Sequence, residues 1–374
     1  MAPPTWFASQ SVMIDLAKLM FAFGLGYLFK STSTSTSTST SASASASALT
    51  QKPTAWLQKN IRHYGYAQDV AAKARHERKN IGSHDEETDN SDNIPDCPYK
   101  YIRKLYGHHH FARFVAAFRP TLKDEDPEKY TLILDIMDAV HLCLILVDDV
   151  CDNSTKRKNQ TAAHLIYGSC ETANRAYLVL TRVIHRAVKT RPVLGAELVR
   201  ALELILEGQD MSLVWRRDGL PAFDAGEGER VLVYKRMAQL KTGTLFVLLG
   251  RLLNDGDDQL DDLLGRFGWY AQLQNDCKNI YSGEYATNKG AVAEDLRNGE
   301  LSFPIVVALG DKRVNTQMEK AIGSHSEGDL VGALEALQSS TVKNKCFKAL
   351  QEASQGLEKL LAVWGRHEQM TAQS

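Results

Sequence analysis

Proline is scarce over most of this chain, and its scarcity is the first indication of the fold. Between residues 128 and 374 only Pro192, Pro221 and Pro304 occur, although the whole chain has 10 prolines. Proline disrupts the interior of a helix because it lacks the backbone N–H and its ring clashes with the preceding turn. Strand-like alternation of useful length is also missing. We therefore expect a largely helical body.

The chain also lacks clustered cysteines and an excess of charge of one sign. Its 6 cysteines stand far apart without a C-x-x-C pair, which excludes a disulfide scaffold and a zinc ribbon and predicts a reducing, cytoplasmic compartment. Because 44 Lys+Arg balance 45 Asp+Glu, the net charge of -1 gives no reason to expect a nucleic-acid partner. Gly-x-Gly-x-x-Gly and P-loop signatures are absent too, so neither nucleotide-binding motif is supported.

The first 94 residues differ in composition from the rest of the chain. Residues 1–30 hold an apolar run at 13–29, which is interrupted by Asp15 and Lys18 and is shorter than the roughly 20 residues of a membrane-spanning helix. We expect a short membrane anchor, an interfacial helix or an uncleaved targeting remnant. Residues 31–94 combine a Ser-rich alternation with a charged stretch and predict a disordered linker. Residues 95–374 are left as the folded catalytic domain.

Apolar residues recur at helical spacing through the folded part. Leu132, Ile136, Val140 and Leu144, for example, follow one another at steps of four. A wide apolar face with a period of about 3.6 residues is typical of a buried helix. The pattern predicts helices over residues 130–152, 172–190, 195–216, 230–253, 259–282 and 301–311.

The first of these predicted helices ends in an acidic cluster, Asp148, Asp149 and Asp152, in the segment VDDVCDN. On a helix the first and last of these carboxylates lie one above the other. Carboxylates at a helix C-terminus oppose the helix dipole and repel one another unless a cation lies between them. Mg²⁺ prefers oxygen ligands and commonly joins carboxylates to substrate phosphates. The cluster therefore predicts a Mg²⁺-diphosphate site in preference to a bare acidic patch.

A second polar cluster, in AQLQNDCKN, repeats this spacing farther along the chain. Its Asn275, Asp276 and Asn279 offer oxygen ligands with less charge, so two such clusters on facing helices would hold a diphosphate through bridging metals. Basic and polar groups suited to phosphate oxygens stand near both clusters. They are Arg157, Lys158, Lys241, Thr242, Gln272 and Lys289.

Four stretches together resemble the trans-isoprenyl diphosphate synthase family, in particular its fungal geranylgeranyl diphosphate synthase branch. They are LVDDVCDNSTKRKNQTAAHLIYG, EGQDMSLVWR, MAQLKTGTLF and QLQNDCKNIYSGEYATNKGAVAEDLRNGELSFPIVVAL, and the resemblance covers most of residues 97–315. It implies an all-α, isoprenoid synthase-type helical bundle around a central active-site cavity, in which Mg²⁺ assists the ionisation of an allylic diphosphate. It also implies a homodimer.

The resemblance further implies roles for individual residues. His141, seven residues before Asp148, occupies the place of a histidine that helps to bind the acceptor, isopentenyl diphosphate. The metal ligands would be Asp148, Asp152, Asn275 and Asp276, with Asp149 as a catalytic residue in the first motif and Asn279 in the second. The allylic diphosphate would be bound by Arg157, Lys241, Thr242, Gln272 and Lys289.

The chain departs from that family on the acceptor side of the site. Where the synthases have a Gly-Lys-x-x-Arg motif that grips the acceptor diphosphate, this chain reads YGHHHFARF, with His108 or His109 in place of the lysine. The arginine is missing unless Arg113 takes its role. The second metal motif begins with Asn275 instead of aspartate, and Glu300 replaces the lysine before Ser-Phe-Pro. The part of the site expected to ionise the allylic diphosphate, the ionising half, thus mostly matches the family. The part expected to bind the acceptor, the acceptor half, differs from it.

This pattern resembles a narrower group, the fungal prenyltransferases of indole diterpene biosynthesis, which transfer a geranylgeranyl group from geranylgeranyl diphosphate to indole-3-glycerol phosphate. His108 and His109, with His110, would suit the phosphate or the ring of that acceptor, and an exposed loop is the alternative for them. A zinc site there is not expected, since no further ligands stand at suitable spacing. Cys143 and Leu144 would let a C20 chain pass, because neither is the bulky aromatic residue with which the family blocks its cavity.

Two other functions stay open at this point. One is a geranylgeranyl diphosphate synthase that condenses isopentenyl diphosphate with allylic diphosphates. The other is a non-catalytic partner subunit of a prenyl synthase. The intact first acidic cluster and Lys241-Thr242 argue against a silent subunit, because a scaffold does not need them.

Overall fold

The computed structural model describes residues 95–371, except 224–225, 227–228, 286–292 and 325. The chain divides into two units, Met1–Tyr64 and Gly65–Ser374, and every described residue belongs to the second. The predicted apolar segment at 1–30 and the predicted linker at 31–94 lie outside the described residues, and so does Lys289. These remain predictions.

Helices make up nearly all of the regular structure in the described residues, as the sequence predicts. The strands found there are β1 (Lys156–Arg157) and β2 (Gln160–Thr161), which pair antiparallel. Each predicted helix is present, with its ends shifted by no more than three residues. The helices are α3 (Pro98–Tyr106), α4 (Ala112–Phe118), α5 (Leu122–Glu125), α6 (Pro127–Asp152), α7 (Ala163–Tyr167), α8 (Ser169–Thr190), α9 (Pro192–Asp218), the 3-10 helix η1 (Leu220–Phe223), α10 (Arg230–Ala238), the π-helix η2 (Gln239–Gly243), α11 (Thr244–Leu253), α12 (Asp261–Tyr281), α14 (Glu294–Asn298), α15 (Phe303–Leu309), α16 (Asn315–Ser324), α17 (Glu327–Gln338), α18 (Ser340–Ser354) and α19 (Glu358–Thr371).

Helix α6 carries the first acidic cluster, and the local sequence explains both of its ends. The Asp126 carboxylate accepts a hydrogen bond from the Lys129 N–H at 2.9 Å, and Pro127 occupies the first turn, where its missing N–H costs nothing. Asn153 ends the helix in the left-handed conformation with φ 52°. Within the described residues α6 is also the one helix long and apolar enough to cross a membrane, and 61% of its apolar window is buried inside the protein.

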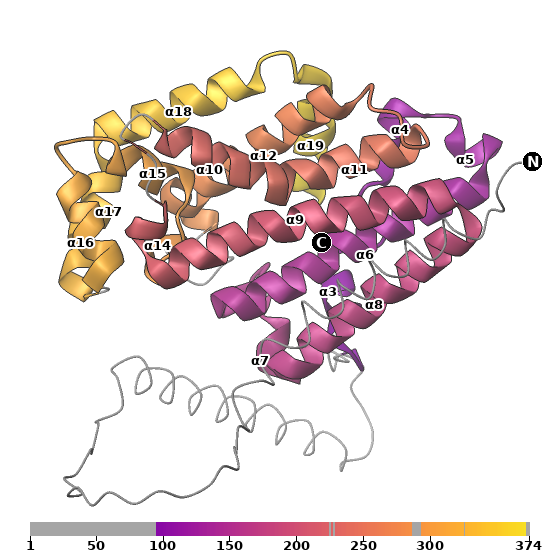
Figure 1. Ribbon diagram of the computed structural model, residues 1–374, viewed down its shortest axis with the longest axis horizontal. Helices are drawn as coiled ribbons and strands as arrows, with labels where there is room; N and C mark the ends of the chain where they lie inside the picture. The colour runs from indigo at the N-terminus through magenta and orange to yellow at the C-terminus, as the bar shows by residue number, and fades with distance from the viewer. Residues whose placement is uncertain (1–94, 224–225, 227–228, 286–292, 325, 372–374) are drawn as a thin grey trace, which may run out of the picture. The chain divides into compact units, whose positions relative to one another are not determined.

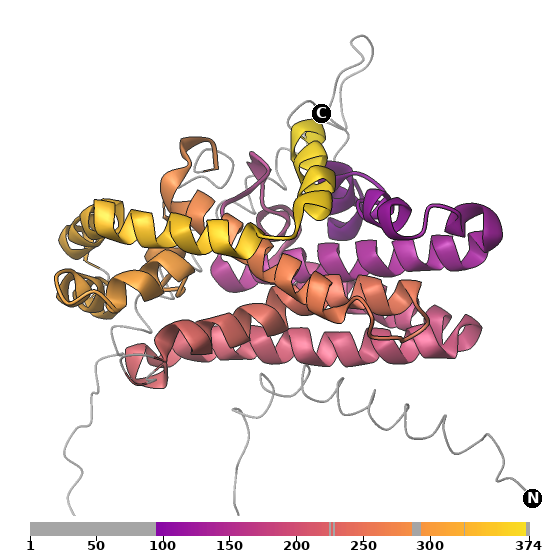
Figure 2. The same ribbon diagram turned by 90° about the horizontal axis from the view of Figure 1, so that it is seen from above.

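Three long helices, α6, α8 and α9, run side by side in this unit (Figure 1). Helix α8 packs on both α6 and α9, while α11 packs on α6, α9 and α12. Both views place α16 and α17 at one end and α4 and α5 at the other (Figures 1 and 2). Buried apolar side chains form one cluster among α3, α6, α7 and α8 and another that joins α9, α10, α12 and α15 to α16, α17 and α18. The acidic end of α6 is thereby held by the first of these clusters.

A π-helical turn interrupts the predicted helix 230–253 and divides it into α10, η2 and α11. Two glycines pack directly against this turn. A Cβ at Gly208 of α9 would lie 2.6 Å from the Lys241 backbone nitrogen, and one at Gly268 of α12 would lie 2.5 Å from Gly243 Cα. Any side chain would force these helices apart, so glycine is required at both positions. Because π turns within α-helices often mark functional sites, the position of Lys241 and Thr242 in this turn supports their predicted roles.

Candidate active site

Asp148 and Asp152 lie where α6 meets α9 and η2. Asp148 Oδ1 accepts hydrogen bonds from Lys241 Nζ at 3.1 Å and from Gln209 Nε2 at 3.3 Å. Asp152 Oδ1 accepts one from Arg216 Nη1 at 2.7 Å. Gln209 and Arg216 stand seven residues apart on α9, so they lie on one face of it. The structure thus brings the two predicted metal-binding carboxylates together with Lys241, and it adds two partners that come from the EGQDMSLVWR stretch.

Asp149 turns away from this face into the protein interior. It is 0% exposed, and its two oxygens accept hydrogen bonds from Arg157 Nε at 3.0 and 3.2 Å, with Arg157 Nη2 also bonded to Oδ1. Arg157 belongs to β1, and the turn that follows takes Lys158 and Asn159 through left-handed conformations with φ 49° and 60°. Such a turn is typical of a tight hairpin. The predicted roles of Asp149 in catalysis and Arg157 in diphosphate binding stay predictions.

Glu300 brings a further carboxylate to the Lys241 ammonium group. Its Oε1 lies 3.7 Å from Lys241 Nζ. Burial by itself lowers the pKa of Lys241, but the charges of Asp148, Glu300 and Asp152 raise that pKa above its ordinary value. Lys241 therefore keeps its positive charge in a half-buried position between carboxylates from α6 and from the segment before α15.

The electrostatic environment of Asp152 fits a divalent cation. Burial raises the pKa of the Asp152 carboxyl to about 8, helped by the negative charges of Asp148 and Glu300 and opposed by Lys241 and Arg216. Burial is the largest cause of this shift, and a cation bound beside the carboxylate would offset both the burial and the repulsion by Asp148 and Glu300. Carboxylate oxygens one helical turn apart are the donor type that a hard cation such as Mg²⁺ prefers. Metal binding by Asp148 and Asp152 stays a prediction, which this donor set supports.

The second predicted cluster lies on α12, and its Asp276 points into the core. Asp276 is 1% exposed and accepts hydrogen bonds from the Tyr234 hydroxyl, from Gln272 Nε2 at 2.8 Å and from the Phe303 N–H at 2.9 Å. Burial raises the pKa of Asp276 to about 6, although these hydrogen bonds lower it. In this arrangement Asp276 connects α12 to α10 and α15, and metal binding by Asp276 stays a prediction.

The other members of the second cluster also have partners near α12. Asn275 Oδ1 accepts a hydrogen bond from the Tyr285 hydroxyl at 2.7 Å. Asn279 Nδ2 donates one to Asp295 Oδ1 at 3.0 Å. Metal binding by Asn275 and the role of Asn279 in the second metal motif therefore stay predictions as well. Glu300 lies near both clusters, because its charge raises the pKa of Asp152 in the first and of Asp276 in the second.

The π turn is tied to the second cluster by a side-chain contact. Thr242 Oγ1 donates a hydrogen bond to Gln272 Oε1, while the amide nitrogen of Gln272 is bonded to Asp276. Two predicted diphosphate-binding residues are therefore in contact with each other. Their binding of a diphosphate stays a prediction.

His141 lies two turns before the acidic cluster on α6, within a group of rings and one cation. This aromatic cluster consists of Tyr106, His110, Phe111, His141 and Lys158. The His110 and His141 rings stack at 5.1 Å with an interplanar angle of 22°, and the Tyr106 ring meets His141 edge-on at 5.5 Å. Lys158 Nζ lies 4.2 Å from the centre of the Tyr106 ring. Burial lowers the pKa of Lys158 to about 8. Flat rings therefore lie beside a cation around His141, and acceptor binding by His141 and Lys158 stays a prediction.

The three consecutive histidine side chains do not form one group, because the backbone directs His110 away from His108 and His109. Their adjacency in the sequence could not show this. His109 adopts the left-handed conformation with φ 59°. Its N–H and that of His110 donate to the buried Asp138 carboxylate at 2.8 and 3.2 Å. His110 joins the aromatic cluster, whereas the His108 and His109 rings lie against each other with their centres 3.6 Å apart. Acceptor binding by His108 and His109 stays a prediction.

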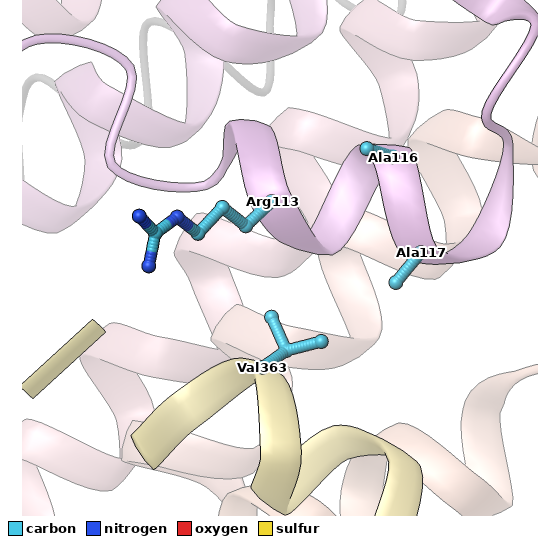
Figure 3. Close-up of a pocket in the computed structure, with 4 residues that line it drawn as sticks. All are labelled: Arg113, Ala116, Ala117 and Val363. Atoms are coloured by element: carbon cyan, nitrogen blue, oxygen red, sulfur yellow. The ribbon is translucent and has the colours of Figure 1, made fainter. Parts of the chain in front are cut away.

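Arg113 lies on α4 beside a cavity of about 400 Å³. Ala116 and Ala117 of the same helix and Val363 of α19 line this cavity with it (Figure 3). Figure 3 shows the Arg113 side chain extending from α4 along the gap between the two helices. Arg113, the basic residue of α4, thus borders a largely apolar cavity, and its role in place of the synthases' arginine stays a prediction.

The chain is similar in sequence to proteins described as prenyltransferases. A family model described as polyprenyl synthetase matches residues 94–337. The prenyltransferase idtC of Claviceps paspali is 69% identical over 368 residues, which cover 98% of this chain and 97% of that relative. The prenyltransferase ltmC of Epichloe festucae var. lolii is 60% identical over 370 residues, which cover 99% of each. The prenyltransferase terC of Tolypocladium album is 60% identical over 323 residues, which cover 86% of this chain and 90% of the relative.

The fold also matches a solved structure. The polyprenyl synthase from Caulobacter crescentus, complexed with calcium and isoprenyl diphosphate, has a TM-score of 0.58 and 20% sequence identity. The match covers 82% of this chain and 90% of that one. At this identity the likeness establishes the fold alone, and it confirms the predicted isoprenoid synthase-type helical bundle.

Proposed function

Because the chain belongs to the polyprenyl synthetase family and is a prenyltransferase, we propose that it transfers a geranylgeranyl group from geranylgeranyl diphosphate to indole-3-glycerol phosphate, with Mg²⁺ as its cofactor, in fungal indole diterpene biosynthesis. One observation carries this proposal. Asp148 and Lys241 are in contact one helical turn from Asp152, which supports an ionising half, and the aromatic cluster around His141 supports an acceptor half that binds a flat ring.

The ionising half would act through charge. Asp148 and Asp152 would hold Mg²⁺, which supplies positive charge to the departing diphosphate when bound. Lys241, now paired with Asp148 and Glu300, lies within reach of oxygens bound at the same place and would bind the diphosphate by charge-assisted hydrogen bonds. The bond between the allylic carbon and the diphosphate oxygen then breaks, and its electron pair leaves with the diphosphate.

The acceptor half would bind a flat ring and a phosphate. Tyr106, His110 and His141 offer ring faces and edges against which an indole packs well. Lys158 offers a positive charge beside them for the phosphate of the glycerol tail. The allylic carbon bonds to an indole ring carbon. That carbon then loses its proton to the released diphosphate or to a nearby main-chain or side-chain oxygen, which restores the aromatic ring.

Three further features belong to the same proposal. A C20 chain is proposed to fit because neither Cys143 nor Leu144 is the bulky aromatic residue that would block it. The protein is proposed to be a cytoplasmic homodimer. Residues 13–29 are proposed to associate it with a membrane, and this can be measured by comparing the vesicle binding of the full chain with that of a chain lacking residues 1–30.

Two parallel assays test the proposed reaction. The purified chain with Mg²⁺ receives geranylgeranyl diphosphate plus indole-3-glycerol phosphate in one, and farnesyl diphosphate plus isopentenyl diphosphate in the other. We expect a prenylated indole in the first and no C20 diphosphate in the second, because YGHHHFARF departs from the Gly-Lys-x-x-Arg motif with which the synthases grip a second diphosphate. Products are identified by mass spectrometry, with a chelator-treated sample as the control.

The same assays separate the alternative functions. A C20 diphosphate in the second assay, with nothing in the first, would make the chain a geranylgeranyl diphosphate synthase. Absence of product from both, with a folded protein, would favour a non-catalytic partner subunit. That last result would be followed by adding a geranylgeranyl diphosphate synthase and measuring whether its rate changes.

Metal binding should depend on pH through Asp152. With its pKa raised to about 8 in the metal-free protein, the Asp152 carboxyl is protonated below that pH and must lose its proton when Mg²⁺ binds. Affinity for Mg²⁺ should therefore rise with pH by up to about tenfold per unit below pH 8 and level off above it. Calorimetry in buffers of different ionisation enthalpy measures this as the number of protons released.

The control for this prediction is Glu300→Gln. Because the Glu300 charge raises the pKa of Asp152, its removal should shift the pH at which proton release ends toward lower values. Arg217→Gln, at an exposed position of α9, should leave the profile unchanged. Binding without proton release at pH 7 would show that Asp152 is already ionised and that the prediction is wrong.

A further inference from the structure

The loop between α3 and α4 holds two histidines that have no part in the aromatic cluster. Asp138 on α6 is 3% exposed and accepts hydrogen bonds from the His109 and His110 N–H groups. The loop also contains two left-handed residues, Gly107 with φ 83° and His109 with φ 59°. A buried carboxylate therefore fixes a loop conformation that a histidine adopts only at a cost.

That conformation brings two neighbouring side chains together. Side chains that follow each other directly along a helix or strand point in different directions. Here the His108 and His109 ring centres lie 3.6 Å apart, with 60° between the ring planes. His109 Nδ1 is buried without a hydrogen-bond partner and lies 3.6 Å from Asp138 Oδ2. A buried polar atom in this state is costly, and a ligand bound at His109 would offset that cost.

A third ligand comes from α6. Asp135 lies one turn before Asp138 on the same helix, and one ligand atom from each of His108, His109 and Asp135 lies within 4.8 Å of the other two. Arg186 Nη2 holds Asp135 Oδ2 at 2.6 Å and thus orients the carboxylate. Carboxylates that bind metals are commonly oriented by such a second hydrogen bond. The third ligand is distant in sequence, which is why a zinc site is not expected from the spacing of the histidines alone.

We infer that His108, His109 and Asp135 form a site for a divalent cation of the zinc type, separate from the Mg²⁺ site. Two imidazole nitrogens and one carboxylate oxygen are typical zinc ligands, whereas Mg²⁺ takes oxygen ligands. Donor atoms around a tetrahedral zinc lie roughly 3.3 Å apart, given zinc–nitrogen distances of about 2.0–2.1 Å. His108 is exposed, and His109 and Asp135 are partly exposed, so small side-chain rotations can close the remaining distance.

The protonation state of His109 is compatible with this site. Burial and the adjacent His108 lower the pKa of His109, and the charges of Asp138 and Asp135 offset this only in part, so that the neutral imidazole is favoured. The neutral form is the one that binds metal ions. Asp135 and Asp138 provide negative charge beside the two rings.

A bound ion would fasten the loop to α6, and the same loop carries His110 and Phe111 of the aromatic cluster. This consequence rests on the proposed function. Zinc would then lower the KM for the indole acceptor and leave the KM for the allylic diphosphate unchanged. The metal site itself requires no activity and can be tested independently.

The test is a titration of the metal-stripped full chain with Zn²⁺ in millimolar Mg²⁺, followed by calorimetry and, with Co²⁺ as the probe, by visible absorption. We expect His108→Ala, His109→Ala and Asp135→Asn each to weaken one zinc-binding event by about tenfold or more. Because the chain has 11 histidines, zinc can bind at more than one place. The test is therefore the difference between each variant and the unaltered chain, and not the total number of zinc ions bound. The matched control is His185→Ala, at an exposed position of α8, which should bind like the unaltered chain.

The outcomes separate the inference from the proposed function. Unchanged zinc affinity in the His108 and His109 variants, with circular dichroism showing them folded, would overturn the inference. If His109→Ala does not fold, His108→Ala decides, because its exposed position makes it structurally mild. The two can also part. If the variants lose zinc binding but the unaltered chain prenylates no indole, the metal site is upheld and the proposed function is rejected.

Discussion

Replacement of Asp148 by alanine should lower kcat by roughly 10³-fold or more while the protein stays folded. In the proposed reaction Asp148 is one of two carboxylates that hold the metal, and it is also bonded to Lys241 and Gln209. Its side chain is 27% exposed, so its removal opens no large cavity in the core. Lys241 would retain Glu300 as a counter-charge. Steady-state turnover in the geranylgeranyl transfer assay measures the loss of kcat. The midpoint of thermal unfolding shows whether the protein stays folded.

Two further variants make this result specific. Asp148→Asn keeps an oxygen for Lys241 and Gln209 but removes the charge, and it should lose at least about 10²-fold if charge on the metal ligand is what matters. Asp218→Asn removes an exposed carboxylate of α9 that is paired with Arg217, and it should turn over normally. Near-normal turnover of Asp148→Ala would refute the metal-binding role.

The helices and the first motif could be predicted from the sequence because both depend on local periodicity. The apolar steps in 130–152 define α6, and the same periodicity places Asp148 and Asp152 on one face and turns Asp149 about 100° away from Asp148. The partner of Asp149 could not be predicted in this way. Arg157 reaches it through a hairpin whose strands have two residues each, too short to give a strand pattern.

The acceptor side and the second cluster could be predicted only in part, because their contacts are distant in sequence. Three consecutive histidines suggest one group, yet the Asp138 carboxylate fixes His109 in a left-handed conformation and directs His110 elsewhere. The spacing of the second cluster repeats that of the first. Its Asp276 is nevertheless bonded to Tyr234, which lies on α10. Spacing shows which residues share a face of a helix, and the packing of other helices decides which face is buried.

The second large effect concerns stability. Arg157→Met should lower the free energy of unfolding by about 3–5 kcal/mol, because it leaves the Asp149 carboxylate buried without a counter-charge. The Asp149 side chain is 1% exposed and that of Arg157 is 12% exposed, so water replaces the lost guanidinium poorly. Urea denaturation followed by circular dichroism measures the difference. Arg217→Met is the matched control and should cost about 1 kcal/mol or less, since the Arg217–Asp218 pair is exposed.

A double variant, Asp149→Leu with Arg157→Met, shows whether the loss comes from the unpaired charge. Replacement of a buried ion pair by apolar residues of similar volume is often neutral, so the double variant should recover most of the lost stability. A double variant as unstable as Arg157→Met would instead assign the loss to packing around the guanidinium.

Once refolded, the double variant also tests the predicted binding of the allylic diphosphate by Arg157. An unchanged KM for that substrate would leave Arg157 the structural role alone, whereas a raised KM would assign substrate binding to the Asp149–Arg157 pair as a unit.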